Sequence, residues 1–381
     1  MKPRMKLKNI LLLTTPASPG RFAGVAAFAR SRGWHLTAAD RLTHSFDGWT
    51  GDGALVTLRD DDSVLQYVNR LRRRRIPVVD LTLTRPDVPL PRVAGDNAAI
   101  GKVAAAHFLS RYFKNTAWFS TGWGHQHALR FDAFSRALPS APERWTWELS
   151  PQRTKSDDWN SLSRWLSRKL AKAARPVGVF CFDDADASRV ESAAIAAGLS
   201  IPGDVAILGA GNDEPLCTSQ IVPLSSVRHD LVANGYAGAG LLDEIMSGKR
   251  PPSAPILIPP AGIAERASTD ALGIIDEIVK RARDIYAKNL AKPPSTAQLA
   301  DAIGVSRATL DRRFASGPGI PPAKLLARMR IDEAKRLMDQ GKMSLGEISW
   351  SLGFCNPAYF SNSFKKATGL SPREWIAARH K

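Results

Sequence analysis

The C-terminal part of the chain contains two copies of one helical pattern, and this repeat limits the folds available more than any other feature. The first copy spans residues 296–314 and the second spans residues 345–364. Each copy has apolar residues at helical spacing, then a glycine, and then a second apolar-periodic segment. The glycines are Gly304 and Gly353. The spacing predicts two helix-turn-helix units in series, with glycine making each tight turn.

Polar residues follow both turns: Ser306 and Asn356 are expected to cap the second helix of each unit. Two such units can place two helices into the major groove of DNA. The net charge of +17 and the isoelectric point near 10.1 also favour a polyanionic partner. Residues 270–381 carry 19 Lys and Arg against 11 Asp and Glu, which gives +8. We therefore predict double-stranded DNA as a partner.

Upstream of this region, short β-rich segments alternate with helical segments over residues 8–268. The alternation predicts an α/β domain whose parallel sheets are covered by helices on both faces. About 260 residues is long for one such sheet, so two lobes with a ligand cleft between them are expected. The expected strands are 9–14, 54–58, 77–81, 117–120, 177–182, 205–208 and 256–258. The expected helices are 21–32, 61–75, 97–113, 126–138, 156–174, 184–198 and 228–248.

The predicted boundary divides the chain into residues 1–268, the α/β effector-binding domain, and residues 269–381, an all-α DNA-binding domain. A helix over 270–290 opens the second domain, and a long helix over 321–338 joins the two helix-turn-helix units. In that domain the periodicity assigns a set of apolar residues to the core. They are Leu299, Leu310, Phe314, Ile348, Phe360 and Phe364.

Composition and motifs also argue against several classes of protein. The three cysteines form no CxxC pair, which fits a reducing cytoplasm. No apolar stretch approaches the ~20 residues of a membrane span. An enzyme on an α/β scaffold would need a nucleophile elbow, a metal cluster or a Gly-rich phosphate loop, and the sequence has none. His125 and His127 lack companions for a metal site, so we interpret them as a loop. No cofactor is expected.

The tandem units resemble the AraC/XylS family of transcription regulators. Residues 348–372, Ile-Ser-Trp-Ser-Leu-Gly-Phe-Cys-Asn-Pro-Ala-Tyr-Phe-Ser-Asn-Ser-Phe-Lys-Lys-Ala-Thr-Gly-Leu-Ser-Pro, follow the family's long fixed-spacing pattern, with Ser349 in the usual Ala position. The resemblance covers roughly residues 275–380. It implies base contacts from the second helix of each unit, by residues Ala308, Asp311, Arg312, Pro357, Ala358 and Asn362.

Arg312 is suited to reading guanine and Asn362 to reading adenine, because their side chains can each make two hydrogen bonds to those bases. The alternative for both is a contact with phosphate. Lys365 and Lys366 are expected to contact phosphate. Arg307 and Asn356 lie on or at the start of the same helices and complete the predicted DNA-binding set.

Residues 8–268 are similar to the sugar-binding core shared by LacI-type repressors and periplasmic sugar-binding proteins. The segments that carry the resemblance are 95–97, 130–134, 182–184, 201–207, 209–214, 224–227 and 265–269. The resemblance makes Asp96, Arg130 and Asp184 the best candidates for contacts with sugar hydroxyls. Without it, each acidic residue after a strand is more simply a helix cap.

One departure concerns the segment after the strand 205–208. The family usually has an acidic residue there that contacts sugar hydroxyls, and this chain has Gly211. Asn212 or Asp213 is the candidate substitute. The ligand of the pocket is therefore less constrained by the sequence than its fold.

Together the two resemblances imply a cytoplasmic, homodimeric, ligand-responsive transcription regulator. They favour an activator of genes for using a carbohydrate, such as the pentose xylose, with RNA polymerase as a further partner. Sugar binding in the cleft would alter DNA binding by the tail. Two alternatives remain open at this point: a regulator with a non-sugar or vestigial pocket, and an α/β enzyme fused to a DNA-binding tail. The sequence does not name the effector, the operator or the sign of regulation.

Overall fold

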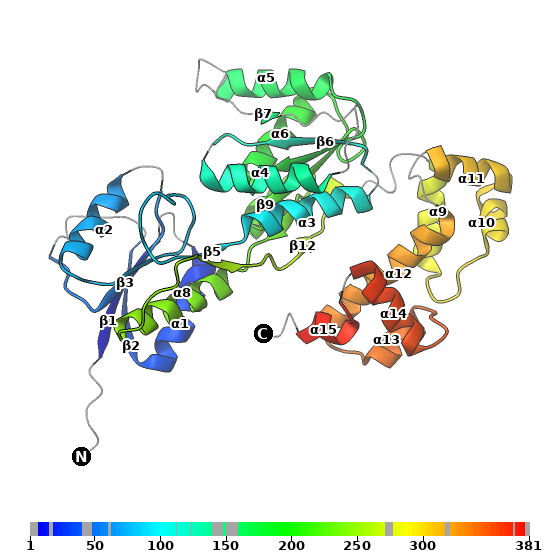
Figure 1. Ribbon diagram of the computed structural model, residues 1–381. Helices are drawn as coiled ribbons and strands as arrows, with labels where there is room; N and C mark the ends of the chain where they lie inside the picture. The colour runs from blue at the N-terminus through cyan, green and yellow to red at the C-terminus, as the bar shows by residue number, and fades with distance from the viewer. Residues whose placement is uncertain are drawn as a thin grey trace.

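The structure is a computed structural model with an α/β region of two lobes followed by a helical domain (Figure 1). It describes residues 7–14, 18–39, 48–59, 62–111, 113–122, 124–138, 148–149, 159–270, 277–316, 321–368 and 370–377. In this part of the chain, no helix combines the length and apolar character needed to cross a membrane.

The first lobe is built on a parallel four-stranded sheet in the order β2-β1-β3-β4. Helices α1 and α8 cover one face and α2 covers the other, because each presents apolar residues to strands that are buried on both faces. The elements are β1 (Lys8–Leu13), α1 (Pro19–Arg32), β2 (Trp34–Ala39), β3 (Gly53–Val56), α2 (Ser63–Arg73), β4 (Val78–Asp80) and α8 (Leu231–Met246).

The second lobe has a six-stranded sheet in the order β12-β10-β9-β8-β6-β7. All its pairings are parallel except β10 with β12, which is antiparallel, so the prediction of parallel sheets holds for all but this edge. Its elements are α3 (Asn97–Ser110), β6 (Asn115–Phe119), α4 (His125–Ala137), β7 (Glu148–Leu149), α5 (Trp159–Ala171), β8 (Val177–Cys181), α6 (Asp184–Ala196), β9 (Val205–Gly211), α7 (Glu214–Ser219), β10 (Ser225–Arg228), β12 (Ile263–Ala264) and η3 (Ala267–Thr269).

Chain segments cross between the lobes after β5 (Val93–Gly95), after β10 and after β11 (Ile256–Ile258). Strands β5 and β11 pair in parallel at this crossing, and the amide of Asp96 donates to the carbonyl of Ile258 at 2.8 Å. These three crossing segments, which follow β5, β10 and β11, connect the two lobes, and we call them the hinge. At the end of the last one, Thr269 is buried and its Oγ1 lies 2.7 Å from Ser225 Oγ of β10.

The helical domain contains two small cores that share one long helix. Helix α12 contributes Leu325 to the first core and Ile331, Ala334 and Met338 to the second. The elements are α9 (Glu277–Lys288), α10 (Thr296–Ile303), α11 (Arg307–Ser316), α12 (Pro322–Gln340), α13 (Leu345–Ser351), α14 (Pro357–Thr368) and α15 (Pro372–Ala377). The two predicted helix-turn-helix units are α10–α11 and α13–α14. The predicted helix over 270–290 is observed as α9, and residues 271–276 lie outside the described part.

The six residues assigned to this core from periodicity are all fully buried. The predicted caps also form: the amide of Thr309 donates to Ser306 Oγ at 3.1 Å, and that of Tyr359 donates to Asn356 Oδ1 at 2.7 Å. Gly304 and Gly353 both have positive φ, of 82° and 70°. The two capping residues and the two turn glycines predicted from the sequence therefore have those roles in the structure.

Replacing the two turn glycines should have unequal effects. A Cβ on Gly304 meets nothing within 4 Å, whereas one on Gly353 would lie 2.0 Å from the carbonyl oxygen of Ala291. Gly304→Ala should therefore cost about 1–2 kcal/mol from the left-handed backbone alone. Gly353→Ala should cost about 3 kcal/mol or more, because the backbone must also shift. Native-state hydrogen exchange in α10–α11 and α13–α14 measures both costs, and equal losses would contradict this account.

Candidate ligand pocket and nucleic-acid interface

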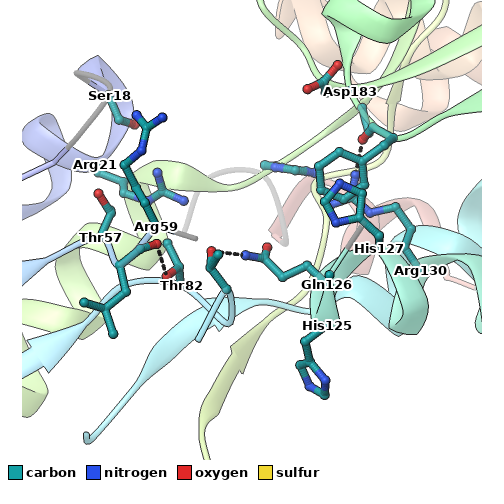
Figure 2. Close-up of a pocket in the computed structure, with 16 residues that line it drawn as sticks. Ser18, Arg21, Thr57, Arg59, Thr82, His125, Gln126, His127, Arg130 and Asp183 are labelled. Atoms are coloured by element: carbon teal, nitrogen blue, oxygen red, sulfur yellow. Dashed lines mark hydrogen bonds between the residues drawn. The ribbon is translucent and has the colours of Figure 1, made fainter. Parts of the chain in front are cut away.

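A pocket of about 560 Å³ lies between the two lobes, and we call it the interlobe pocket (Figure 2). Both lobes contribute polar side chains to its wall. The first lobe supplies Ser18, Arg21, Thr57, Arg59, Thr82 and Thr84. The second lobe supplies His125, Gln126, His127, Arg130, Phe182 and Asp183. His229, which follows β10 in a crossing segment, also lines the pocket. A ligand here would contact both lobes and the hinge.

Arg130 of α4 is the most deeply buried charge in this wall, with 3% of its surface exposed. Its Nε and Nη2 donate to Asn97 Oδ1 at 3.1 and 2.7 Å, and its Nη1 donates to the carbonyl of Phe182. The guanidinium also lies over the Phe182 ring, 4.4 Å from its centroid. Burial lowers the pKa of Arg130 to about 10, against the opposing effects of Asp183 and Asp184, so it stays charged at neutral pH.

The segment Gly124-His-Gln-His127, interpreted from the sequence as a loop, opens helix α4 and faces the pocket. The ring of His127 stacks on Phe182, with centroids 3.6 Å apart and planes at 19°. Gln126 Nε2 donates to Thr84 Oγ1 at 2.5 Å and so links the two lobes. Within the described ranges no group of His, Cys, Asp and Glu could hold a metal ion. These residues therefore offer the pocket an aromatic surface and hydrogen-bonding groups.

Arg21 and His229 form the other side of the pocket. Arg21 Nε donates to Asn234 Oδ1 at 2.9 Å, and burial lowers its pKa while Asp80 acts in the opposite direction. The pKa of His229 falls to about 3 because of burial and then because of Arg130 and Arg21. His229 is therefore neutral at pH 7. Its Nε2 is buried and has no hydrogen-bond partner among the described residues.

Of the five predicted ligand residues, Arg130 alone lines the interlobe pocket in the described structure. Asp96 caps α3, accepting from the amide of Ala99 at 2.9 Å. Asp213 caps α7, accepting from the amide of Leu216 at 3.1 Å. Asn212 Oδ1 accepts from Arg266 at 2.8 Å. These three side chains bond within the protein instead of facing the pocket.

Asp184 is also engaged internally. Its Oδ1 accepts from Ser226 Oγ at 2.5 Å, and its Oδ2 accepts from the amide of Asp213 at 2.7 Å. Burial raises the pKa of Asp184, while these hydrogen bonds counteract that rise. The carboxylate therefore fastens β10 and the start of α7 to α6. The neighbouring Asp183, which was not predicted, is the one carboxylate among the described residues that line the pocket.

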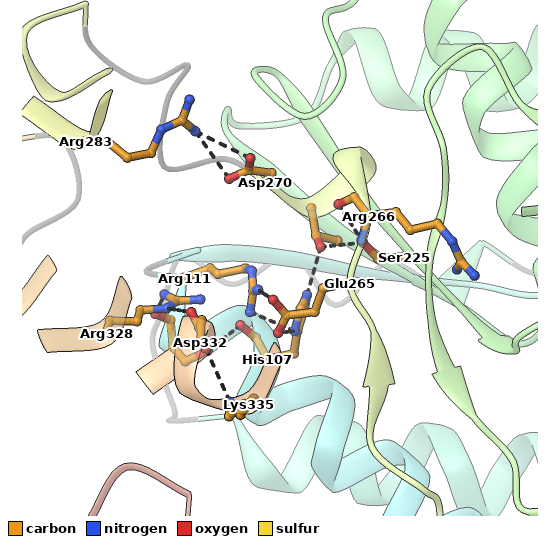
Figure 3. A network of polar contacts seen from close by, with 12 residues as sticks. His107, Arg111, Ser225, Glu265, Arg266, Asp270, Arg283, Arg328, Asp332 and Lys335 are labelled. Atoms are coloured by element: carbon orange, nitrogen blue, oxygen red, sulfur yellow. Dashed lines mark hydrogen bonds and ion pairs between the residues drawn. The ribbon is translucent and has the colours of Figure 1, made fainter. Parts of the chain in front are cut away.

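A second polar cluster joins the α/β region to the helical domain (Figure 3). We call it the α3–α12 contact; it comprises His107, Ser110, Arg111, Glu265, Arg328 and Lys335. Arg111 Nη2 pairs with Glu265 Oε2 at 2.6 Å, and Arg328 of α12 donates to the carbonyl of Ser110. Burial of the Glu265 carboxyl acts to raise its pKa, but the nearby cations Arg111, Lys335 and Arg328 outweigh burial and lower it. Two cations of α12 thus lie close to the anion of the second lobe.

The helical domain presents the predicted DNA-binding residues on the exposed sides of α11 and α14. Every one of them is exposed: Arg307, Ala308, Asp311, Arg312, Asn356, Pro357, Ala358, Asn362, Lys365 and Lys366. The opposite sides bury Leu310 and Phe314 on α11, and Phe360 and Phe364 on α14. Arg307 Nε lies 3.7 Å from Asp311 Oδ2, at one-turn spacing. Each second helix is therefore held by its apolar side and leaves its polar side available.

Two known families match segments of this chain, one in the α/β region and one in the helical domain. Residues 105–269 match the family described as a periplasmic binding protein-like domain, and residues 299–378 match the family described as a helix-turn-helix domain. The xylose operon regulatory protein of Escherichia coli strain K12 is 25% identical over 347 residues, covering 86% of this chain and 84% of that protein. The protein of the same name from Haemophilus influenzae is 25% identical over 288 residues, covering 75% and 74%.

Solved structures agree on the fold. The chain is similar to the xylose-binding transcription activator xylR, with a TM-score of 0.60 and 23% identity, covering 98% of both chains. The transcriptional regulator CelR in complex with cellobiose matches with a TM-score of 0.53 and 19% identity, covering 68% of this chain and 84% of that one. The first match spans both domains and the second is limited to about two thirds of the chain.

Two substitutions on the exposed sides of α11 and α14 should have different effects on DNA binding. Arg312→Ala should cost ~1–3 kcal/mol on the preferred site and relax the choice of base at one position, because a base contact carries sequence information. Lys365→Ala should weaken all sequences alike and flatten the salt dependence, because a phosphate contact releases counterions.

Binding titrations against a randomised DNA library at two salt concentrations distinguish the two effects. Lys324, an exposed lysine on α12 of the same domain, provides a charge-matched control as Lys324→Ala. If Arg312→Ala lowered affinity equally for every sequence, Arg312 would be a phosphate contact instead.

Proposed function

We propose that this chain, a transcription regulator that joins a periplasmic-binding-protein-like domain to an AraC-type helix-turn-helix domain, binds a carbohydrate between its lobes and changes its DNA binding in response. The observation that carries the proposal is the interlobe pocket itself. Its wall draws polar side chains from both lobes and from His229 at the hinge. A ligand that bonds to both walls favours the closed arrangement, and only such a difference in affinity can shift a conformational equilibrium.

The lining supports a carbohydrate as the class of effector. Gln126 offers an amide group that can both donate and accept hydrogen bonds, as vicinal hydroxyls require, and Thr57 and Thr82 offer hydroxyl oxygens as acceptors, with Thr82 Oγ1 itself donating to Asp80 Oδ1 at 2.8 Å. His127, stacked on Phe182, gives the pocket an aromatic wall on which a sugar face can lie. The E. coli and H. influenzae relatives are named as xylose operon regulators, so pentoses such as xylose are the first candidates.

The predicted ligand residues take two roles in this proposal. Arg130 contacts the effector. Asp96, Asp184, Asn212 and Asp213 hold the strand ends and helix starts around the pocket through the hydrogen bonds described above. A pocket whose wall cannot hold a sugar, either vestigial or adapted to another ligand, is the competing proposal, and Gly211 is the sequence feature that favours it.

On the DNA side, the proposal assigns residues 269–381 to operator recognition through α11 and α14, acting in the cytoplasm. Homodimerisation through the α/β region would bring two such domains to one operator. Phe22 of α1 and Val232 and Tyr236 of the adjacent α8 are 45%, 51% and 48% exposed, which fits a surface that a second copy covers. We propose activation, with RNA polymerase as the contact that a DNA-bound dimer would recruit.

A thermal-shift screen of pentoses, hexoses and their acids on the full chain tests the effector class. A carbohydrate that binds should stabilise the protein by about 2.7 kcal/mol at a hundredfold excess over its dissociation constant. The same compound should change the affinity for operator DNA in a fluorescence titration. Stabilisation by no member of the panel would favour the vestigial or non-sugar alternative.

The α3–α12 contact supports a route from pocket to DNA, since Arg130 bonds to Asn97 at the start of α3 and the contact lies at its end. Glu265→Gln should leave effector affinity within about twofold. It should reduce the ratio of DNA affinities with and without effector several-fold, out of the 5–150-fold typical of allosteric coupling. The matched control is Glu244→Gln, an exposed glutamate of α8 that pairs with Lys249 at 3.0 Å. Equal coupling in both variants would remove Glu265 from the route.

A further inference from the structure

The interlobe pocket has a positively charged inner end where the two lobes meet. Arg21 enters from the first lobe and Arg130 from the second, and both act on the pKa of His229. All three residues also line a small cavity of about 40 Å³ next to the pocket, so they surround one place. Figure 2 shows Arg21 and Arg130 on opposite sides of the pocket. Two cations from different lobes therefore converge on the hinge.

The partners of both guanidinium groups are neutral. Arg21 donates to the amide oxygen of Asn234, and Arg130 donates to the amide oxygen of Asn97 and the carbonyl of Phe182. Asp80 acts on Arg21 from outside the pocket wall, but it is itself paired with Arg92, with Nε 3.2 Å from Oδ2. Burial lowers the pKa of Arg130, and Asp183 and Asp184 act against burial without forming an ion pair with it. Buried charges are usually paired with an opposite charge, and among the described residues neither guanidinium has an ion-pair partner.

Few carboxylates belong to the part of the wall that the structure describes. Among the described lining residues, Asp183 is the one acid, against Arg21, Arg59 and Arg130. Asp183 Oδ1 caps helix α6 by accepting from the amide of Asp186 at 2.7 Å. Asp184, which the family resemblance would direct at sugar hydroxyls, is held by Ser226 and the amide of Asp213. The described part of the wall is thus better suited to donating hydrogen bonds than to accepting them.

His229 adds an unsatisfied group at the same place. Its Nε2 is buried without a partner in the part of the chain that the structure describes, and the ring is neutral. In the tautomer that carries its hydrogen on Nε2, a neutral imidazole donates one hydrogen bond from this atom. An acceptor placed between the two arginines would satisfy it, and a charged acceptor would make the strongest hydrogen bonds with all three groups.

We infer that the effector is an anionic carbohydrate, whose carboxylate or phosphate group lies between Arg21 and Arg130 and accepts from His229 Nε2. The inference rests on the proposed function and specifies its ligand class. The hydroxyl groups of the same molecule face Thr57, Thr82 and Gln126 on the pocket wall. Arg21 and Arg130 belong to different lobes. An anion bound between them attracts both side chains and therefore favours the closed arrangement of the lobes.

Calorimetry with matched pairs of ligands tests the charge directly. D-xylose is compared with D-xylonate, D-galactose with D-galacturonate, and D-glucose with glucose 6-phosphate, at one ionic strength. At least one acid should bind tenfold or more tightly than its neutral partner, which corresponds to ~1.4 kcal/mol. Whether the tightest ligand carries a carboxylate or a phosphate identifies the source of the anion. Raising the salt concentration should reduce the preference.

Substitutions at Arg21 test whether the preference for the acid over its neutral partner arises in the interlobe pocket. Arg21→Gln should bring the acid and its neutral partner to within about threefold of each other, and Arg21→Lys should keep most of the preference because it keeps the charge. Arg30, an exposed arginine on the same helix α1, provides the control as Arg30→Gln, which should change nothing. Circular dichroism confirms folding, and retention of the preference in a folded Arg21→Gln protein would overturn the inference.

The remaining outcomes separate this inference from the function on which it rests. A neutral sugar that binds as tightly as its acid would overturn the anionic ligand and leave a sugar-responsive regulator. Inorganic phosphate that binds as tightly as glucose 6-phosphate would overturn the carbohydrate part, because the anion alone would account for binding. Binding of neither the neutral nor the acidic sugars would overturn both proposals.

Discussion

The buried guanidinium of Arg130 is the interaction on which the arrangement of the α/β region depends. Removing this charge from water is costly unless its donors are satisfied, and it remains charged because its pKa stays near 10. Its hydrogen bonds reach Asn97 at the start of α3 and the carbonyl of Phe182 at the end of β8. One side chain of α4 therefore fixes a helix start and a strand end beside the pocket. Any ligand that contacts Arg130 acts on all three elements at once.

Helix α3 extends this constraint toward the DNA-binding domain. Its 14 residues span about 21 Å at a rise of 1.5 Å per residue. At the pocket end Asn97 bonds to Arg130, and at the far end the carbonyl of Ser110 accepts from Arg328 of α12. Helix α12 contributes to the cores of both helix-turn-helix units, so in the proposal made above a displacement of α3 would reach both. Contiguous contacts of this kind are a physical route for coupling, and the coupling itself is what the Glu265 variant measures.

The helical domain could be predicted almost completely from the sequence, because each local signal there agrees with the fold. Periodicity, turn glycines and caps all indicated the same elements. In the α/β region the longer apolar strands were predicted, and the short strands β5 and β12 and the more polar strands β2 and β10 were missed. Strand β10 begins with Ser225 and Ser226, both fully buried and hydrogen-bonded, and β2 at the sheet edge has a mixed sequence. Hydrophobic patterning does not detect a strand whose stability comes from side-chain hydrogen bonds.

The pocket was harder to predict, because the same residue types serve two purposes. Asp96 and Asp213 follow strands and precede helices, a position that suits both a ligand contact and an N-cap, and both act as caps. Gln126 gave no signal of its own and His127 suggested only an incomplete metal site, since their role depends on α4 facing the other lobe. Arg21 and His229 come together only through the hinge, which no local pattern describes.

Gly211 connects the family departure to the charge of the pocket. Its φ of 127° favours glycine, and a Cβ there would lie 3.2 Å from Asp184 Oδ2. An acidic side chain at this position would therefore begin beside a carboxylate whose pKa is already raised by burial, and a second negative charge nearby would raise it further. With glycine in its place, Asp184 stays bonded to Ser226 and the amide of Asp213, and no carboxylate from this turn reaches the wall. In the proposal made above, Gly211 and the two arginines therefore act in the same direction: the wall lacks the acceptor that an acidic residue at 211 would supply, and Arg21 and Arg130 provide donors.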